Sequence, residues 1–259
     1  MELRLAAASL IAGSLVLAGC ASTPATAPSG PAASTPTQVE KKTVTVFAAA
    51  SLTAAFTDIG KLDPNLEVRY TFDGSPTLVD QIKGGAPADV LATADQANMT
   101  KALDGRLVQP DPTIFATNVG VLIVPKGNPG GITGLDASLD GKKLVICAPA
   151  VPCGAVAANL AMEAGVELKP VSEEQKVTDV RGKVASGEAD AGIVFSTDAK
   201  AAGDDVETIE LQGAVQHATR YPMSPVVASQ NQDAAQAFIE LVTSEKGRAV
   251  LTEYGFGTP

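Results

Sequence analysis

Short β-branched and apolar runs alternate along this chain with segments in which apolar residues recur at helical spacing. Thr43–Phe47 is typical of a strand, and Leu52, Ala55, Phe56 and Ile59 then follow at helical spacing. Similar patterns predict strands over 66–72, 90–92, 119–124, 144–146, 193–195 and 207–210, and helices over 154–164, 179–186, 234–242 and 247–254. This alternation predicts an α/β fold with open sheets covered by helices on both faces.

The first twenty residues are typical of an export signal. Leu5–Leu17 is apolar or small, too short to span a bilayer comfortably, and the segment closes with Leu17-Ala18-Gly19-Cys20. This ending resembles the bacterial lipobox, in which the cysteine is lipidated and becomes the new N-terminus. We therefore expect residues 1–20 to be a lipoprotein signal peptide and Cys20 to anchor the exported protein at the outer face of the cytoplasmic membrane. A plain secretory signal with an incidental cysteine is the alternative.

Residues 21–42 are expected to form a disordered spacer. The stretch from Ala21 to about Thr37 consists of Ala, Ser, Thr, Pro and Gly with no charge. It cannot bury enough apolar surface to offset its chain entropy. Its prolines favour a semi-extended linker between the anchor and the folded part.

Charge and residue content restrict the classes of function. The chain carries 19 Lys and Arg against 29 Asp and Glu, a formal net charge of −10. Nucleic acid is therefore not expected as a partner, since a phosphate backbone needs a basic surface. The chain has a single histidine, His217, without a GxSxG-like motif or metal-ligand spacing around it. We therefore expect no catalysis, no cofactor and no cation site, and His217 is expected in a loop or on the surface.

Several predicted helices begin at a small or hydroxyl residue directly after a strand. Ser51 follows the first strand, Ser75-Pro76 follows the second, and Cys153 and Val180 lie at later helix starts. Ser75 is expected to be an N-cap with Pro76 at the first helical position. Free N–H groups and the positive end of the helix dipole can bind an anion without Lys or Arg. Each junction taken singly is also explained by ordinary helix capping.

Whole motifs point to one family. Val46-Phe47-Ala48-Ala49-Ala50-Ser51-Leu52 resembles the first-strand motif of the molybdate-binding proteins of ABC importers. The segments 84–90, 148–154, 187–199, 221–222 and 254–256 resemble further motifs of that family in the same order. The resemblance covers about residues 43–259.

The resemblance implies a type II periplasmic-binding fold, in which two α/β lobes with mixed open sheets close on a ligand. It implies a first lobe of residues 43–122 plus 225–259 and a second lobe of residues 123–224. The ligand would lie in the cleft between them. A monomer is expected.

The family's ligand set can be carried over position by position. It implies hydroxyl donors at Ser51 and Ser75 and backbone N–H donors at Cys153 and Val180. Phe195 stands where the family often has a tyrosine, so one hydroxyl contact is missing there. Asp73 is expected to point away from the site, because its carboxylate would repel an anion.

A site of donors alone suits a fully deprotonated oxyanion. The resemblance implies molybdate as the ligand, with tungstate expected to bind as well, and an ABC permease with its ATPase as the partner. Monoprotonated phosphate carries an O–H that needs an acceptor, so such a site should reject it. Sulfate or another tetrahedral oxyanion is the alternative ligand, since sulfate also only accepts hydrogen bonds.

The remaining cysteines suggest a bridge beside the site. With Cys20 lipidated, an exported domain is left with Cys147 and Cys153. We predict a disulfide between them that holds the Cys153 N–H in place. Two buried free thiols are the alternative.

Overall fold

The computed structural model describes residues 41–259. The predicted signal peptide with Cys20, and the predicted spacer up to residue 40, lie outside the described residues. Among the residues that are described, none of the helices is long and apolar enough to cross a membrane.

The first of two five-stranded sheets begins with the predicted first strand. Its order is β2-β1-β3-β10-β4, with β1 parallel to β2 and β3, and β10 antiparallel to β3 and β4. The bounds are β1 Lys42–Ala49, β2 Leu66–Asp73, β3 Val90–Ala92, β4 Thr113–Asn118 and β10 Thr219–Pro225.

The second sheet has the order β7-β6-β8-β5-β9. Strand β6 is parallel to β7 and β8, whereas β5 is antiparallel to β8 and β9. The bounds are β5 Gly120–Pro125, β6 Leu144–Cys147, β7 Ser172–Glu174, β8 Ala191–Phe195 and β9 Val206–Ile209. Both sheets are mixed, as the fold prediction states.

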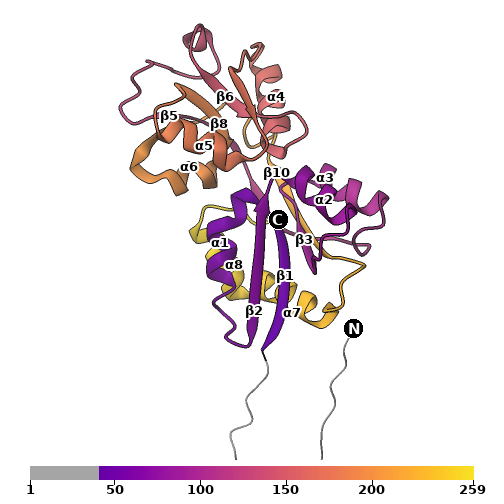
Figure 1. Cartoon of the computed structure of the whole chain (residues 1–259). Helices are drawn as coiled ribbons and strands as arrows, with labels where there is room; N and C mark the ends of the chain where they lie inside the picture. Colours follow the sequence, from indigo (N-terminus) through magenta and orange to yellow (C-terminus); the bar gives the residue numbers. More distant parts are fainter. Residues whose placement is uncertain (1–40) are drawn as a thin grey trace, which may run out of the picture. The chain divides into compact units, whose positions relative to one another are not determined.

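Each sheet has its own helices, and we name the two sets the first lobe and the second lobe (Figure 1). The first lobe has α1 Thr53–Ile59, α2 Ser75–Lys83, α3 Gln96–Asp104, α7 Gln232–Thr243 and α8 Glu245–Glu253, with the short 3-10 helix η1 Ala50–Leu52. The second lobe has α4 Pro152–Ala164, α5 Val177–Ala185 and α6 Ser196–Ala202, with η2 Ala137–Leu139 and η3 Gly203–Asp205. In the first lobe, α2 and α3 lie on one side of the sheet and α1 and α8 on the other (Figure 1).

The strand pairing moves the expected lobe boundaries. The chain passes from the first sheet to the second at Val119, between β4 and β5, rather than after residue 122. It returns with β10, which pairs with β3 and β4, so the first lobe resumes at Thr219 rather than at 225. A boundary after residue 122 would fall inside β5, all of which pairs with β8 and β9 of the second sheet.

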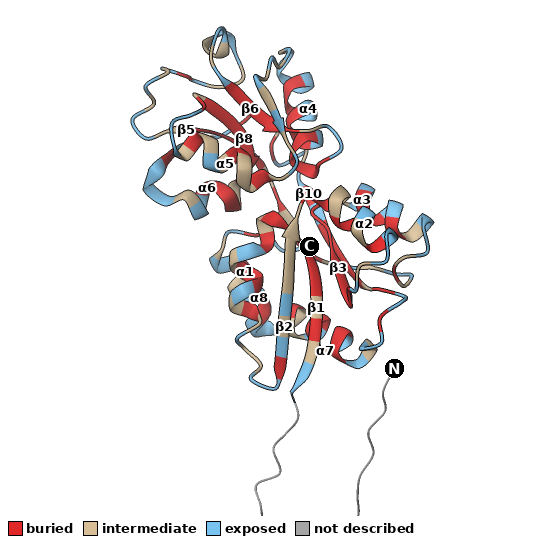
Figure 2. Cartoon of the chain, viewed as in Figure 1, coloured by how far each residue is buried: buried red, intermediate tan, exposed pale blue. Residues whose placement is uncertain are grey.

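The buried residues, red in Figure 2, lie mainly along the strands and on parts of the helices. Most of them are apolar. In the first lobe the Phe56 ring lies 5.5 Å from that of Phe115 and 5.4 Å from that of Phe238. These three rings join α1, β4 and α7, and aromatic pairs at such distances add to the stabilisation from burial. Helix α1, which follows the Ser51 turn directly, is therefore fixed to the core of its lobe.

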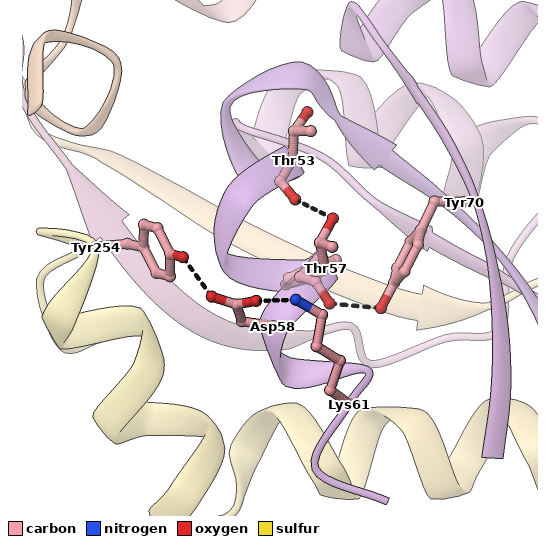
Figure 3. Close-up of polar contacts among 7 residues, drawn as sticks. Thr53, Thr57, Asp58, Lys61, Tyr70 and Tyr254 are labelled. Carbon is pink, nitrogen blue, oxygen red and sulfur yellow. Dashed lines mark hydrogen bonds and ion pairs between the residues drawn. The ribbon is translucent and has the colours of Figure 1, made fainter. Parts of the chain in front are cut away.

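Polar contacts also hold α1, from two sides (Figure 3). The Tyr70 hydroxyl of β2 donates to the Phe56 carbonyl oxygen at 2.6 Å, and the Tyr254 hydroxyl donates to the Asp58 carboxylate. Lys61 also pairs with Asp58, at 2.6 Å, and its hydrogen bond holds the pKa of that carboxyl below its usual value. Strand β2 and the C-terminal segment are thus each joined to α1 by a tyrosine hydroxyl.

Candidate functional site

A narrow pocket with a free volume of about 10 Å³ lies where helix starts from both lobes meet. Its lining comes from the carboxyl ends of β1, β2, β3 and β8 and from the loop after β6. The lining residues are Ala49, Ala50, Ser51, Asp73, Gly74, Ser75, Ala94, Val151, Pro152, Cys153, Val177 and Phe195. In open α/β sheets this end of the strands is where ligands bind. A larger hollow beside Lys42 and Asn231 lies at the opposite, amino end of β1 and has no such convergence of helix starts.

The pocket brings together four of the five residues carried over from the family. Ser51, Ser75, Cys153 and Phe195 all line it. Val180 is not among its lining residues: it is fully buried, and its side chain lies so close to Gly192 that an added Cβ there would be 2.7 Å from it. It is the fourth residue of α5, and the first four N–H groups of a helix have no acceptor within it. Val177, the first residue of α5, lines the pocket, and the role of Val180 stays a prediction.

Ser75 is fully buried and fixed by a main-chain donor. Its Oγ accepts a hydrogen bond from the Ala94 N–H at 3.0 Å. The predicted N-cap role is wrong, because Gly74 is the N-cap of α2 and Ser75 is its first residue. The shift of one position frees the Ser75 side chain from its own helix and turns it towards the turn after β3.

Ser51 lies in η1, and its hydroxyl has a partner that the sequence did not suggest. Its Oγ is 3.0 Å from the hydroxyl oxygen of Tyr221 on β10. Tyr221 is fully buried, which raises the pKa of its hydroxyl, and its ring meets that of Phe195 edge-on at 6.0 Å. Phe195 has no hydroxyl where the family often has a tyrosine. Tyr221 nevertheless supplies a tyrosine hydroxyl next to Ser51.

Cys153 carries the first amide hydrogen of α4, because Pro152 before it has no N–H. End amides of this kind have no acceptor inside the helix and carry the positive end of its dipole. The next residue must be glycine, since a Cβ at Gly154 would lie 2.1 Å from the carbonyl oxygen of Ala148. This close approach brings the helix start tightly against the loop after β6.

The predicted disulfide is confirmed. Cys147 and Cys153 are bridged, with their Cα atoms 5.6 Å apart, and both residues are buried. The bridge joins the end of β6 to the first turn of α4. It therefore closes the loop that carries Val151 and Pro152 into the pocket.

Removing this bridge is expected to destabilise the second lobe. Chain entropy for so short a loop gives about 2 kcal/mol of unfolding free energy. Urea unfolding of the Cys147→Ala/Cys153→Ala variant, and of the native protein with and without reductant, measures the loss. Alanine is chosen because it leaves no polar group at these buried positions. Equal unfolding midpoints for all samples would contradict a stabilising bridge.

Among the described residues that line the pocket, Asp73 is the one acidic side chain. Asp73 does line the pocket, and its Oδ1 accepts from the N–H of Gly74 at 2.8 Å. The carboxylate is thus engaged by Gly74, the cap residue of α2, and the expectation that it points away from the site stays a prediction. Among the described residues, those that line the pocket include no Lys or Arg. Any anion there would be held by hydroxyls and main-chain N–H groups.

A second hollow behind Ser51 contains a buried carboxyl group. It is lined in part by Ser51, Thr178, Arg181 and Asp198. Asp198 is 2 % exposed, its Oδ2 has no hydrogen-bond partner, and its Oδ1 lies 3.9 Å from Nη1 of Arg181. Burial raises the pKa of Asp198 from 3.8 to about 7, and the Arg181 charge and the Phe195 amide only partly oppose this.

This raised pKa predicts a pH-dependent stability. Between pH 3.8 and about 7 the folded protein holds a proton on Asp198 that the unfolded chain has released. Asp198 therefore contributes fully to the free energy of unfolding below pH 3.8. This contribution, on the order of a few kcal/mol, is lost as the pH rises to about 7. Unfolding free energies at pH 5 and pH 8 should show that the native protein loses stability relative to Asp198→Asn. An unchanged difference between the two proteins would contradict the raised pKa.

The predicted loop residue His217 is remote from this pocket. Its Nε2 lies 2.6 Å from Oε2 of Glu163 in the second lobe. Neither residue lines the pocket between the helix starts.

Comparison with known proteins supplies the family. A family model described as bacterial extracellular solute-binding protein matches residues 44–257. The chain is 37% identical over 261 residues to the molybdate-binding protein ModA of Mycobacterium tuberculosis, covering 98% of this chain and 97% of that protein. The chain belongs to the ModA family. This confirms the resemblance on which the ligand set was based.

Two further proteins match most of the chain. The solved periplasmic molybdate-binding protein of Azotobacter vinelandii superposes with a TM-score of 0.74 at 19% identity, over 83% of this chain and 99% of that chain. A Bacillus subtilis protein, YvgL, named as a candidate ABC transporter substrate-binding lipoprotein, is 28% identical over 253 residues, 93% of each chain. The predicted two-lobe α/β fold is confirmed. Solute binding by this family is a transport function rather than a catalytic one.

Proposed function

We propose that this protein captures molybdate, and tungstate with it, in the pocket between the two lobes. The proposed donors are the hydroxyls of Ser51 and Ser75 and the N–H groups of Cys153 and Val180, with the Phe195 ring closing one side. The observation that carries the proposal is the convergence of Ser51, Ser75 and Cys153 in a pocket whose lining, among the described residues, has no Lys or Arg. ModA-family membership supports molybdate as the ligand.

The chemistry of the donors matches the chemistry of the ligand. Molybdate and tungstate are fully deprotonated dianions at neutral pH, so each of their oxygens only accepts hydrogen bonds. Hydroxyls and N–H groups at helix starts donate to such an anion without counter-charges. Phosphate at neutral pH carries at least one O–H, which would need an acceptor in the site.

The proposed function includes delivery to an ABC permease with its ATPase. We infer that the protein is exported, is anchored through a lipid on Cys20 and acts as a monomer at the outer face of the cytoplasmic membrane. The lipobox-like Leu17–Cys20 segment and the lipoprotein name of the Bacillus relative support the anchor. No resident cofactor is proposed.

Calorimetric titration of the purified protein with molybdate, tungstate, sulfate and phosphate tests the proposal. Tight binding of molybdate and tungstate is expected, with sulfate weaker and phosphate without measurable heat. Binding of sulfate in preference to molybdate would overturn the ligand assignment and favour the sulfate receptor that the sequence left open.

A further inference from the structure

A chain of buried hydrogen bonds runs behind Ser51 and ends at the junction of the two lobes. Asn118, the last residue of β4, is 3 % exposed, and its Nδ2 lies 3.3 Å from the Tyr221 hydroxyl oxygen. That hydroxyl lies 3.0 Å from Ser51 Oγ, on the wall of the pocket. The sequence positions of these groups are far apart, so only the fold connects them.

Groups that can only donate fix the direction of these hydrogen bonds. Asn118 Oδ1 is 3.0 Å from the N–H of Val119, a group that can only donate, and 2.9 Å from Ser196 Oγ. This identifies Oδ1 and leaves Nδ2, a pure donor, facing Thr197 Oγ1 at 2.8 Å and the Tyr221 hydroxyl. The Tyr221 oxygen must then accept from Asn118.

The direction continues to the pocket. A tyrosine hydroxyl that accepts from Asn118 keeps its single hydrogen for its other neighbour, which is Ser51 Oγ. Ser51 Oγ then accepts from Tyr221, and its own hydrogen is left to donate into the pocket. Asn118 therefore determines, through Tyr221, that Ser51 faces the ligand as a donor.

The donor direction of the Ser75 hydroxyl is fixed in the same way, by a single main-chain N–H. Its Oγ accepts from the Ala94 N–H, which cannot reverse its role, so the Ser75 hydrogen is also free for the pocket. Both serine hydroxyls thus accept from a neighbouring group and keep their hydrogen for the pocket, although they belong to different turns. This agreement is a second observation in favour of a Ser51 hydroxyl that donates its hydrogen into the pocket.

We propose that Asn118 and Tyr221 are positioning residues that fix the hydroxyl of Ser51 as a hydrogen-bond donor to a fully deprotonated oxyanion. The proposal rests on the proposed function of the pocket and adds the device by which the pocket selects acceptor-only ligands. Neither residue lines the pocket. Both act through the direction of one hydrogen bond.

Asn118→Asp reverses the direction of these hydrogen bonds and leaves the shape of the side chain at position 118 nearly unchanged. The carboxylate of Asn118→Asp only accepts, so the Tyr221 hydroxyl turns to donate to it. Ser51 then donates to Tyr221, and a Ser51 lone pair faces the anion. Adding Tyr221→Phe removes the hydroxyl that transmits this reversal but keeps the introduced carboxylate.

Calorimetric titration with molybdate at mildly alkaline pH compares four proteins: the native protein, Tyr221→Phe, Asn118→Asp and the double variant. Tyr221→Phe is expected to weaken binding several-fold. Asn118→Asp is expected to weaken it more than about tenfold, as the loss of a hydrogen bond to a charged ligand implies. The double variant is expected to bind more tightly than Asn118→Asp alone, a non-additivity that a simple charge or folding effect does not produce.

Tyr70→Phe is the matched control, because it removes another tyrosine hydroxyl of the same lobe that bonds the Phe56 carbonyl instead. It should leave molybdate affinity unchanged, and thermal unfolding verifies that every variant is folded. A double variant as weak as Asn118→Asp would overturn the proposal. Should Asn118→Asp not fold, an unchanged affinity in Tyr221→Phe overturns it instead.

Titration of the native protein distinguishes a failure of this proposal from a failure of the proposed function. If it binds sulfate rather than molybdate, the ligand assignment fails, and the same four proteins titrated with sulfate still test the hydrogen-bond chain. Recovery of sulfate affinity in the double variant would support the chain, and absence of recovery would overturn it.

Discussion

Replacing Ser51 and Ser75 together with alanine is expected to weaken molybdate binding by roughly 10²–10⁴-fold. Each hydroxyl is expected to donate to the dianion, and a hydrogen bond to a charged group contributes about 1.5–3 kcal/mol. Both side chains line the pocket, and their oxygens already accept from Tyr221 and Ala94, so their hydrogens have no competing use. Calorimetric titration of the double variant measures the loss of affinity.

The control for this experiment is Thr57→Ala. Its hydroxyl lies on the exposed side of α1 and donates to the Thr53 carbonyl, as Figure 3 shows. It should bind molybdate like the native protein. Ser75→Ala also leaves the Ala94 N–H without its partner, which costs about 1–3 kcal/mol of stability, so unfolding curves accompany each titration. A folded double variant with native affinity would move the site elsewhere.

Replacing Gly74 with alanine is expected to weaken binding by hindering the approach of the two lobes. Gly74 has φ −62° and ψ 140°, which alanine adopts without strain. The added Cβ would nevertheless lie 2.0 Å from the carbonyl oxygen of Gln175, which belongs to the second lobe. Relieving such overlap typically costs about 1–3 kcal/mol, so molybdate affinity should fall roughly 5- to 150-fold.

Gly182→Ala is the matched glycine control. It lies in α5, and a Cβ there meets nothing within 4 Å. This variant should retain native affinity and gain slightly in stability through helix propensity. Gly74→Ala should unfold at nearly the native temperature, because the overlap lies between lobes rather than inside one. Native affinity in a folded Gly74→Ala protein would contradict the lobe contact.

The fold was predictable where apolar patterns are local. The strand at Thr43–Phe47 and the helix after it carry period-2 and helical spacing within a few residues, and both are present. Strand β10 was not predicted, since Pro222 and Pro225 are unusual in a strand with neighbours on both sides. Its position between β3 and β4 is set by tertiary pairing, which no local pattern reports.

The site was predictable only as far as its motifs reach. Ser51, Ser75 and Cys153 were placed by the family motifs, and the structure gathers them in one pocket. Tyr221 lies 170 residues from Ser51, so the hydrogen bond between them leaves no signal in the spacing of residues. The cap of α2 was displaced by one residue, an offset that is common at helix ends.

A crystal structure of the protein with molybdate, located by the anomalous scattering of molybdenum, tests the central claim most directly. The account predicts the metal centre between the lobes, with its oxygens within hydrogen-bond distance of the Ser51 and Ser75 hydroxyls and the Cys153 N–H. Molybdate held by a lysine or arginine side chain, or bound away from this pocket, would contradict the account.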